Sequence, residues 1–189
     1  MTLATTQTQF APDDVLALED EGLFELVDGK LVEKNMSSLA TRSVGMICTE
    51  LGVYLKTVAS GGACFTEQAF QCFPHDPQMI RRPDLAVVVA ERLHLVPDEG
   101  HVPVAPDLAV EVISPTDRVY DLEQKLKDYF SAGIKLVWVV SPYSRTVHVH
   151  RLDTTETKLG QADTLTGESV LPGFSVVVAN LFPPLRAKA

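Results

Sequence analysis

The chain has 189 residues, of which 46% are hydrophobic and 22% charged, values typical of a folded globular protein. Its 25 acidic and 16 basic residues give a net charge of −9 at pH 7, which argues against a broad basic surface for gripping nucleic acid. No apolar run approaches the roughly 20 residues that span a bilayer, and the polar start does not resemble a signal peptide. We therefore expect a soluble, cytoplasmic protein that makes no membrane contact.

Several familiar kinds of site are missing from the sequence or only weakly suggested by it. There is no P-loop, dinucleotide-binding fingerprint or nucleophile elbow. Three cysteines form no CxxC pair and are expected to be buried free thiols: Cys48, Cys64 and Cys72. His148 and His150 alternate on one expected strand, but nothing else with ligand spacing accompanies them. An exposed strand face is therefore favoured there over a zinc site.

The first 60 residues suggest a helix, a hairpin and a long helix behind a flexible arm. Residues 1–11 are the expected arm, and a proline followed by acids opens a short helix over 12–20. Two alternating runs around a central Asp-Gly turn predict a β-hairpin over 24–34. Apolar residues three or four positions apart predict an amphipathic helix over 37–60, which a glycine pair ends.

The rest of the chain is rich in strands. A loosely alternating strand is expected over 63–73, and an amphipathic helix over 117–132. A further strand is expected over 146–151, with two or three more after it. Three continuous apolar runs are predicted to be buried strands: 84–90, 107–114 and 135–141.

The order of these elements predicts the fold class. The one strand-helix-strand crossover among many strands indicates an α/β fold, with a mixed β-sheet core and flanking helices. The length fits a single domain, and the sequence shows no repeat or linker. After the arm, we expect the core over 12–150 and C-terminal strands with a tail over 151–189.

Two acids stand where a buried strand would not ordinarily place them. Asp84 begins the first apolar run, and Glu111 lies in the middle of the second, between two valines. A glutamate in an apolar strand must face a polar cleft, unless the strand lies at an edge and turns the side chain to water. Because two neighbouring strands could bring both carboxylates together, we favour a Mg²⁺ or Mn²⁺ site, to which the carbonyl after Glu111 could contribute. A metal held there would activate water and polarise a phosphate.

Longer motifs around these acids resemble a known family. The segments PDLAVVV and PDLAVEVISPTDRVYDLEQKLKDYFSAGIKLVWVVSP, with the opening FELVDGKLVEKNMS, look like those of the Uma2 family (DUF820). The resemblance covers roughly residues 12–150. Its pattern includes Ser114, Pro115, Asp121, Lys125, Tyr129, Gly133 and Trp138. It implies the restriction-endonuclease-like fold of the PD-(D/E)XK nuclease superfamily, and metal-dependent hydrolysis of DNA.

The chain departs from the superfamily pattern in two places. The lysine that usually follows the glutamate by two residues is replaced by Ile113, and the resemblance implies that Lys125 on the next helix takes its place. Many relatives carry a histidine near the start of the long helix, and this chain has Ala40, Thr41 and Val44 there. Any role for that histidine is therefore absent.

The resemblance implies a role for each of four residues. Asp84 and Glu111 would bind the metal, and Lys125 would orient the attacking water or stabilise the transition state. Glu25 on the hairpin would hold a metal-bound water or the lysine. Plainer alternatives remain: Glu25 could be a surface acid, and Lys125 could belong to a solvated helix face. Asp121, one helical turn before Lys125, could pair with it and orient it.

The acidic net charge is the main objection to a DNA substrate. Arg81, Arg82 and Arg118 could answer it in part, because a phosphate needs only a local positive potential. We predict a metal-dependent endonuclease acting on DNA. The alternatives are a nuclease-fold binding or regulatory protein without turnover, and a metal-dependent hydrolase of a small phosphoester. A homodimer is also expected, because the strand at 136–140 and the late strands would leave apolar surface to cover.

Overall fold

The computed structural model describes residues 9–57, 61–115 and 117–184. Its centre is a six-stranded mixed sheet with the strand order β3-β4-β5-β6-β7-β8. The strands are β3 (Ala63–Thr66), β4 (Leu85–Val88), β5 (Leu108–Val112), β6 (Leu136–Ser141), β7 (Thr146–Arg151) and β8 (Glu156–Leu159). The α/β class with a mixed sheet and flanking helices, predicted from the sequence, is confirmed.

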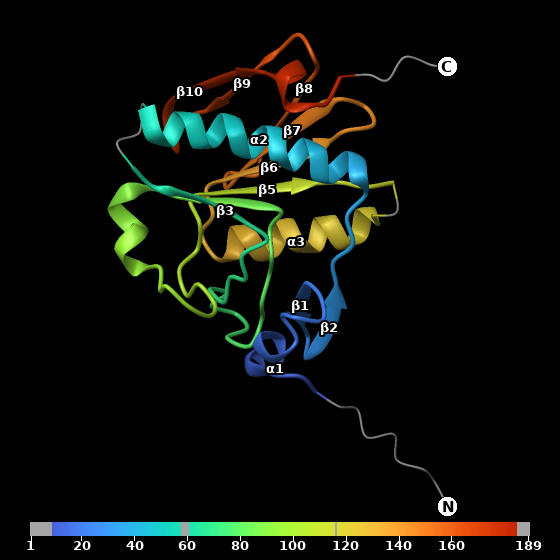
Figure 1. Cartoon of the computed structure of the whole chain (residues 1–189), viewed down its shortest axis with the longest axis vertical. Coiled ribbons are helices and arrows are strands. Elements are labelled where there is room, and N and C mark those ends of the chain that lie inside the picture. The colour runs from blue at the N-terminus through green and yellow to red at the C-terminus, as the bar shows by residue number, and fades with distance from the viewer. Residues whose placement is uncertain (1–8, 58–60, 116, 185–189) are drawn as a thin grey trace, which may run out of the picture.

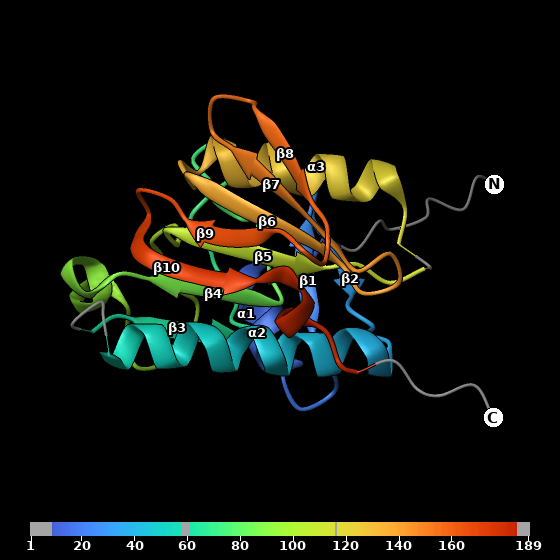
Figure 2. The same ribbon diagram turned by 90° about the horizontal axis from the view of Figure 1, so that it is seen from above.

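Helices and a second hairpin cover the two faces of this sheet. One face carries α2 (Ser38–Thr57) and the hairpin of β9 (Thr164–Gly167) and β10 (Leu171–Val177), and α3 (Val119–Ser131) lies on the other (Figures 1 and 2). The helix α3 is the crossover between β5 and β6, which pair in parallel, as two parallel strands require. All the other pairings in the sheet are antiparallel.

Alternation along the central strands separates two cores. Val110 and Val112 of β5 pack toward α2, whereas Ala109 packs toward α3, and Glu111 shares the face of Ala109. The expected apolar surface at 136–140 is not found, because every residue of Leu136–Val140 is buried inside the sheet. The part of the homodimer argument that rested on residues 136–140 was therefore wrong, and the dimer stays a prediction.

A small N-terminal unit packs beside the sheet, as Figure 1 shows. It consists of α1 (Pro12–Ala17) and the predicted hairpin, formed by β1 (Phe24–Val27) and β2 (Lys30–Glu33). Asp28 and Gly29 have φ angles of 51° and 71°, the positive values that a tight two-residue hairpin turn requires. Leu26 exchanges two backbone hydrogen bonds with Ile80, 3.0 and 2.9 Å long, which fixes the hairpin against the segment before β4.

Some predicted bounds differ from the observed ones. The first helix ends at Ala17 rather than at residue 20. The strand expected over 63–73 ends at Thr66, because Glu67 adopts a positive φ of 52° that an extended strand does not allow. Residues 58–60 of the predicted long helix and 1–8 of the expected arm lie outside the described residues.

Two short 3₁₀ helices, Ala90–Leu95 and Val178–Leu181, complete the described structure. The three cysteines are free, as predicted, but half-buried rather than buried. Within the described ranges, no helix is long and apolar enough to cross a membrane.

Candidate active site

Asp84 and Glu111 meet at the junction of two adjacent strands. Leu85 of β4 pairs with Val110 of β5 in antiparallel register, so the residue before Leu85 lies opposite the residue after Val110. Both carboxylates are buried, and Asp84 Oδ2 accepts a hydrogen bond of 2.5 Å from the backbone N–H of Val112. Because β5 lies between β4 and β6, the alternative of an edge-strand glutamate turned to water is wrong.

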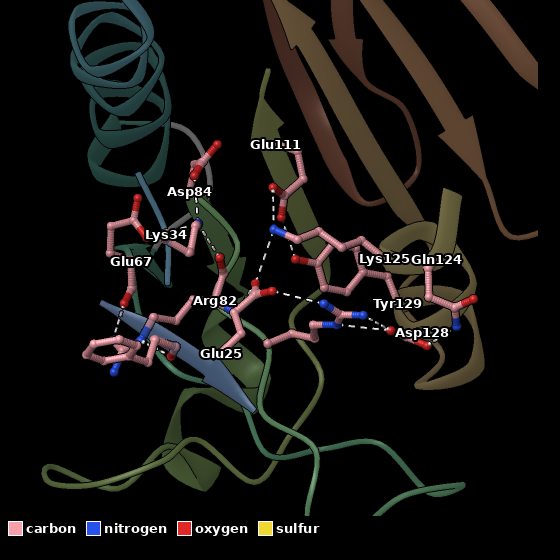
Figure 3. Close-up of polar contacts among 12 residues, drawn as sticks. Glu25, Lys34, Glu67, Arg82, Asp84, Glu111, Gln124, Lys125, Asp128 and Tyr129 are labelled. Carbon is pink, nitrogen blue, oxygen red and sulfur yellow. Dashed lines mark hydrogen bonds and ion pairs between the residues drawn. The ribbon is translucent and has the colours of Figure 1, made fainter. Parts of the chain in front are cut away.

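The helix α3 supplies the partners of Glu111. Lys125 Nζ lies 3.2 Å from Glu111 Oε2 and 3.2 Å from Glu25 Oε1, and the Tyr129 hydroxyl donates to Glu111 Oε1 at 2.5 Å (Figure 3). Lys125 and Tyr129 are four residues apart and therefore share one helix face. The Lys125 side chain is only 17% exposed, so it does not belong to a solvated face.

Glu25 is part of the same cluster and not a surface acid, since it is 1% exposed. Its Oε2 accepts from Arg81 at 2.9 Å, and its Oε1 accepts from the backbone N–H of Arg82 at 3.0 Å. Burial alone would raise the pKa of Glu25, but the charges of Lys125, Arg81 and Lys34 outweigh it and lower the pKa to about 2. Glu25 is therefore a carboxylate at neutral pH.

Lys34 and Glu67 join the cluster without having been predicted. Lys34, directly after β2, places Nζ 2.7 Å from Asp84 Oδ1, 3.0 Å from Glu67 Oε2 and 2.5 Å from the Arg82 carbonyl oxygen. One indication in the sequence that Lys34 could lie at the site is that it belongs to the same predicted hairpin as Glu25. Glu67 follows the short strand β3, and no sequence pattern distinguishes it.

Glu67 has an unusual environment. Its backbone lies in the left-handed region, which non-glycine residues seldom adopt outside constrained sites. Both of its carboxylate oxygens are buried, and neither accepts a well-formed hydrogen bond from the described residues, although Lys34 is close enough for an ion pair. Burial raises the pKa of Glu67 to about 7, with Lys34 opposing the rise and Asp84 adding to it.

The pKa values of the clustered groups are shifted by burial and by neighbouring charges, which act in opposite directions. Burial raises the pKa of Glu111, Lys125 opposes this rise, and the nearby charge of Asp84 adds to it. Burial would lower the pKa of Lys125, but Glu111 and Glu25 outweigh it and raise the pKa. The pKa of Lys34 is raised in the same way, because the charges of Glu111, Asp84 and Glu67 outweigh the effect of burial. Both lysines are therefore ammonium ions at neutral pH.

Two of the three arginines expected near the site do not offer free positive charge. Arg81 is buried and donates to Asp128 as well as to Glu25. Arg82 is buried and donates to carbonyl oxygens of the chain and, at 3.4 Å, to Glu19. Of the three arginines, only Arg118 lines the cleft that opens onto the cluster.

A cleft of about 220 Å³ opens onto the cluster. Its charged lining comprises six acids and three basic residues: Glu25, Glu33, Asp84, Asp117, Asp121, Glu111, Lys34, Arg118 and Lys125. Asp121 lines the cleft, but within the described ranges it forms no ion pair with Lys125, so the pairing that the sequence left open is not observed.

The donor set fits a hard divalent cation. Asp84 and Glu111 present carboxylate oxygens from two rigid strands, which is the chemistry that Mg²⁺ and Mn²⁺ prefer. The orphaned carboxylate of Glu67 shows that the buried acids hold more acceptor capacity than the surrounding donors satisfy. Asp84 and Glu111 could therefore hold the metal, with the Glu67 carboxyl as a further oxygen donor nearby.

Comparisons with known proteins place this arrangement in a family. Residues 12–180 match the sequence model of the Uma2 family, whose description is "Putative restriction endonuclease". A similar solved structure is described as "a putative nuclease belonging to DUF820 from Anabaena variabilis ATCC 29413". The two structures share a TM-score of 0.75 and 20% sequence identity over 92% of this chain and 97% of the other.

At that identity the structural likeness establishes the fold, and it confirms the predicted restriction-endonuclease-like architecture. No curated protein matches the chain. The family match spans most of the sequence and includes all four predicted site residues. On this ground, the chain belongs to the Uma2 family.

Proposed function

We propose that the protein is a nuclease that hydrolyses phosphodiester bonds in DNA with Mg²⁺ or Mn²⁺ bound at Asp84 and Glu111. The observation that carries the proposal is the convergence of these carboxylates from adjacent strands, with the Lys125 ammonium 3.2 Å from Glu111. Membership of a family whose description is "Putative restriction endonuclease" supports the nuclease activity. When bound, the cation would polarise the scissile phosphate and lower the pKa of a water molecule.

The position of Lys125 suits transition-state stabilisation. Glu111 and Glu25 hold its ammonium from two sides, so the charge has a fixed place beside the cleft. Because its pKa is raised, Lys125 is already protonated at neutral pH and cannot accept a proton from water. We therefore assign it to stabilising the charge that develops on the phosphate, or to orienting the attacking water. Glu25 is its positioning partner.

The remaining members of the cluster maintain this geometry. Tyr129 donates to Glu111 Oε1 and fixes the carboxylate, while Lys34 holds Asp84 and neutralises part of the acidic cluster. Because the lining of the cleft is acidic, DNA would approach with one phosphate at the cation rather than by broad electrostatic contact.

The acidic cleft also favours a second candidate, a metal-dependent hydrolase of a small phosphoester. A small cleft lined with more acids than bases suits a compact substrate whose phosphate is neutralised by the cation. The two candidates share the site and differ in what reaches it.

A substrate panel tests the proposal and separates these candidates. The wild-type protein is incubated with supercoiled plasmid, linear duplex, single-stranded DNA and bis(p-nitrophenyl) phosphate, in Mg²⁺, Mn²⁺ or EDTA. Cutting of at least one DNA in the presence of metal, abolished by EDTA, is the expected result. Hydrolysis of the small diester alone would favour the second candidate. No turnover of any substrate would contradict the nuclease and leave a binding protein of the same fold.

A further inference from the structure

A second group of potential metal ligands lies on β7 and β8, on the same face of the sheet as Glu111 but toward the opposite edge of the sheet from Asp84. His148 and His150 are two residues apart on β7, so their side chains share one face of the sheet. In the register of β7 with β8, His150 pairs with Glu156. The strand β6 separates these residues from β5, which carries Glu111. The group is therefore distinct from the acidic cluster.

The donor atoms of these three residues converge. One ligand atom from each of His148, His150 and Glu156 lies within 4.8 Å of the others. His148 Nδ1 contacts Glu156 Oε1, and His150 Nδ1 lies 4.0 Å from Glu156 Oε2. The two imidazole rings are nearly parallel, at 18° with centroids 6.3 Å apart. Both rings thus present the same nitrogen toward one carboxylate.

The sequence pattern alone could not show this convergence. The alternating histidines favoured an exposed strand face, because no third ligand stood at a suitable spacing. The third ligand comes from the next strand, and the turn that brings β8 back along β7 decides its position. The side chains of His148 and His150 are 32% and 19% exposed, so the face is half-buried and open to solvent on one side.

Two imidazoles and a carboxylate form a donor set that binds borderline transition-metal ions, such as Zn²⁺, in preference to Mg²⁺. Burial lowers the pKa of His150, which favours the neutral imidazole that a metal requires. Two positive charges oppose the binding of a cation at this place, since Lys158 pairs with His148 in the register and Arg151 follows His150. These charges weaken cation binding without blocking the three donors.

We propose that His148, His150 and Glu156 form a second metal site, which binds Zn²⁺ or a similar transition-metal ion and ties the edge strand β8 to β7. Three protein ligands leave a fourth position for water. The site does not depend on the proposed nuclease function. Its donors select Zn²⁺, Co²⁺ or Ni²⁺, whereas the oxygen donors at Asp84 and Glu111 select Mg²⁺ or Mn²⁺.

Metal titration of the full chain tests the proposal. Zn²⁺ binding is measured by calorimetry, and Co²⁺ binding by its visible absorption, in wild type, His150→Ala and Glu156→Gln. Glu156 is an exposed side chain, so its variant keeps the fold even if the histidine variant does not. His94→Ala, which removes an exposed histidine elsewhere, is the matched control. Glu111→Gln distinguishes this site from the acidic cluster.

We expect one Zn²⁺ ion per chain in the wild type, the His94 variant and the Glu111 variant. Loss of one of three ligands is expected to weaken binding in the other two variants by at least about 10-fold. Zn²⁺ at 100 times its Kd should raise the Tm of the wild type by roughly 5–10 °C. Absence of Zn²⁺ binding, equal binding in wild type and Glu156→Gln, or loss of binding in Glu111→Gln would each overturn the proposal.

Discussion

At the scale of single residues, replacement of Lys125 distinguishes a role in the hydrolytic step from a role in metal binding. Its ammonium bridges Glu111 and Glu25, and its removal would leave both carboxylates without that neutralising charge. Replacement by methionine keeps an unbranched side chain as far as Cε and removes the ammonium group with its charge. We expect Lys125→Met to lower kcat by about 10²–10³-fold, the usual effect of losing one fixed transition-state charge.

The same variant should bind Mn²⁺ at least as tightly as the wild type, because a positive charge beside a metal ligand is gone. Calorimetry measures this binding, and Lys127→Met, an exposed lysine of the same helix, is the control. Equal loss of activity in both lysine variants, or full activity in Lys125→Met, would contradict the assignment.

Glu25 gives a prediction for the pH dependence of stability. Its pKa in the folded protein is about 2, below its ordinary value of 4.5, so the folded state favours the ionised form. The resulting stabilisation is fully present above about pH 4.5 and is lost as the pH falls toward 2. Glu25→Gln should therefore reduce the free energy of unfolding strongly at pH 6 and much less at pH 3. Urea unfolding at both pH values measures the difference, and an equal loss at the two would refute this assignment.

At the scale of secondary structure, the aspartates that precede β4 and β5 make equivalent contacts. Each of the two strands follows a Pro-Asp pair, which ends in Asp84 for β4 and in Asp107 for β5. Asp84 Oδ2 accepts from the N–H of Val112, the last residue of β5, and Asp107 Oδ2 accepts from the N–H of Val89, directly after the end of β4. The other oxygen of each carboxylate meets a cation, Lys34 for Asp84 and Arg92 for Asp107. Each aspartate thus joins one strand to its antiparallel neighbour.

This similarity provides a control for the role of Asp84. Asp84→Asn and Asp107→Asn remove equivalent contacts, so both should destabilise the protein, by roughly 1–3 kcal/mol for a weakened buried hydrogen bond to a charged group. Only Asp84 lies opposite Glu111, so only Asp84→Asn should abolish cleavage. Thermal unfolding and plasmid cleavage, measured on both variants, check this. Loss of cleavage in Asp107→Asn with retained folding would show that the contact between strands, and not metal binding, makes Asp84 essential.

The same strands show which site residues could be predicted from the sequence and which could not. Asp84 and Glu111 could be predicted to meet because each belongs to a continuous apolar run, and such runs pair in a buried sheet. Lys34 and Glu67 lie beyond strand ends, where position depends on long-range contacts such as those between Leu26 and Ile80. Local patterning contains no information on those contacts. Arg81 was misjudged for the same reason, since its partner Asp128 lies 47 residues away.

At the scale of the whole molecule, the net charge of −9 and the acidic cleft restrict how a polyanion can bind. The buried arginines do not relieve this field, because they are already paired with acids and carbonyl oxygens. Under the proposed function, a divalent cation bound at Asp84 and Glu111 would therefore be the main source of positive potential for a phosphate. Binding and catalysis should then depend on the same two carboxylates.

Plasmid cleavage in Mn²⁺ by wild type, Glu111→Gln and Asp107→Asn, with the folding of each checked by circular dichroism, tests the proposed active site most directly. We expect nicking or linearisation by the wild type and by Asp107→Asn, and none by Glu111→Gln, which keeps the size of the side chain and loses its charge. Cleavage by Glu111→Gln at the wild-type rate would contradict a metal-dependent active site at Asp84 and Glu111.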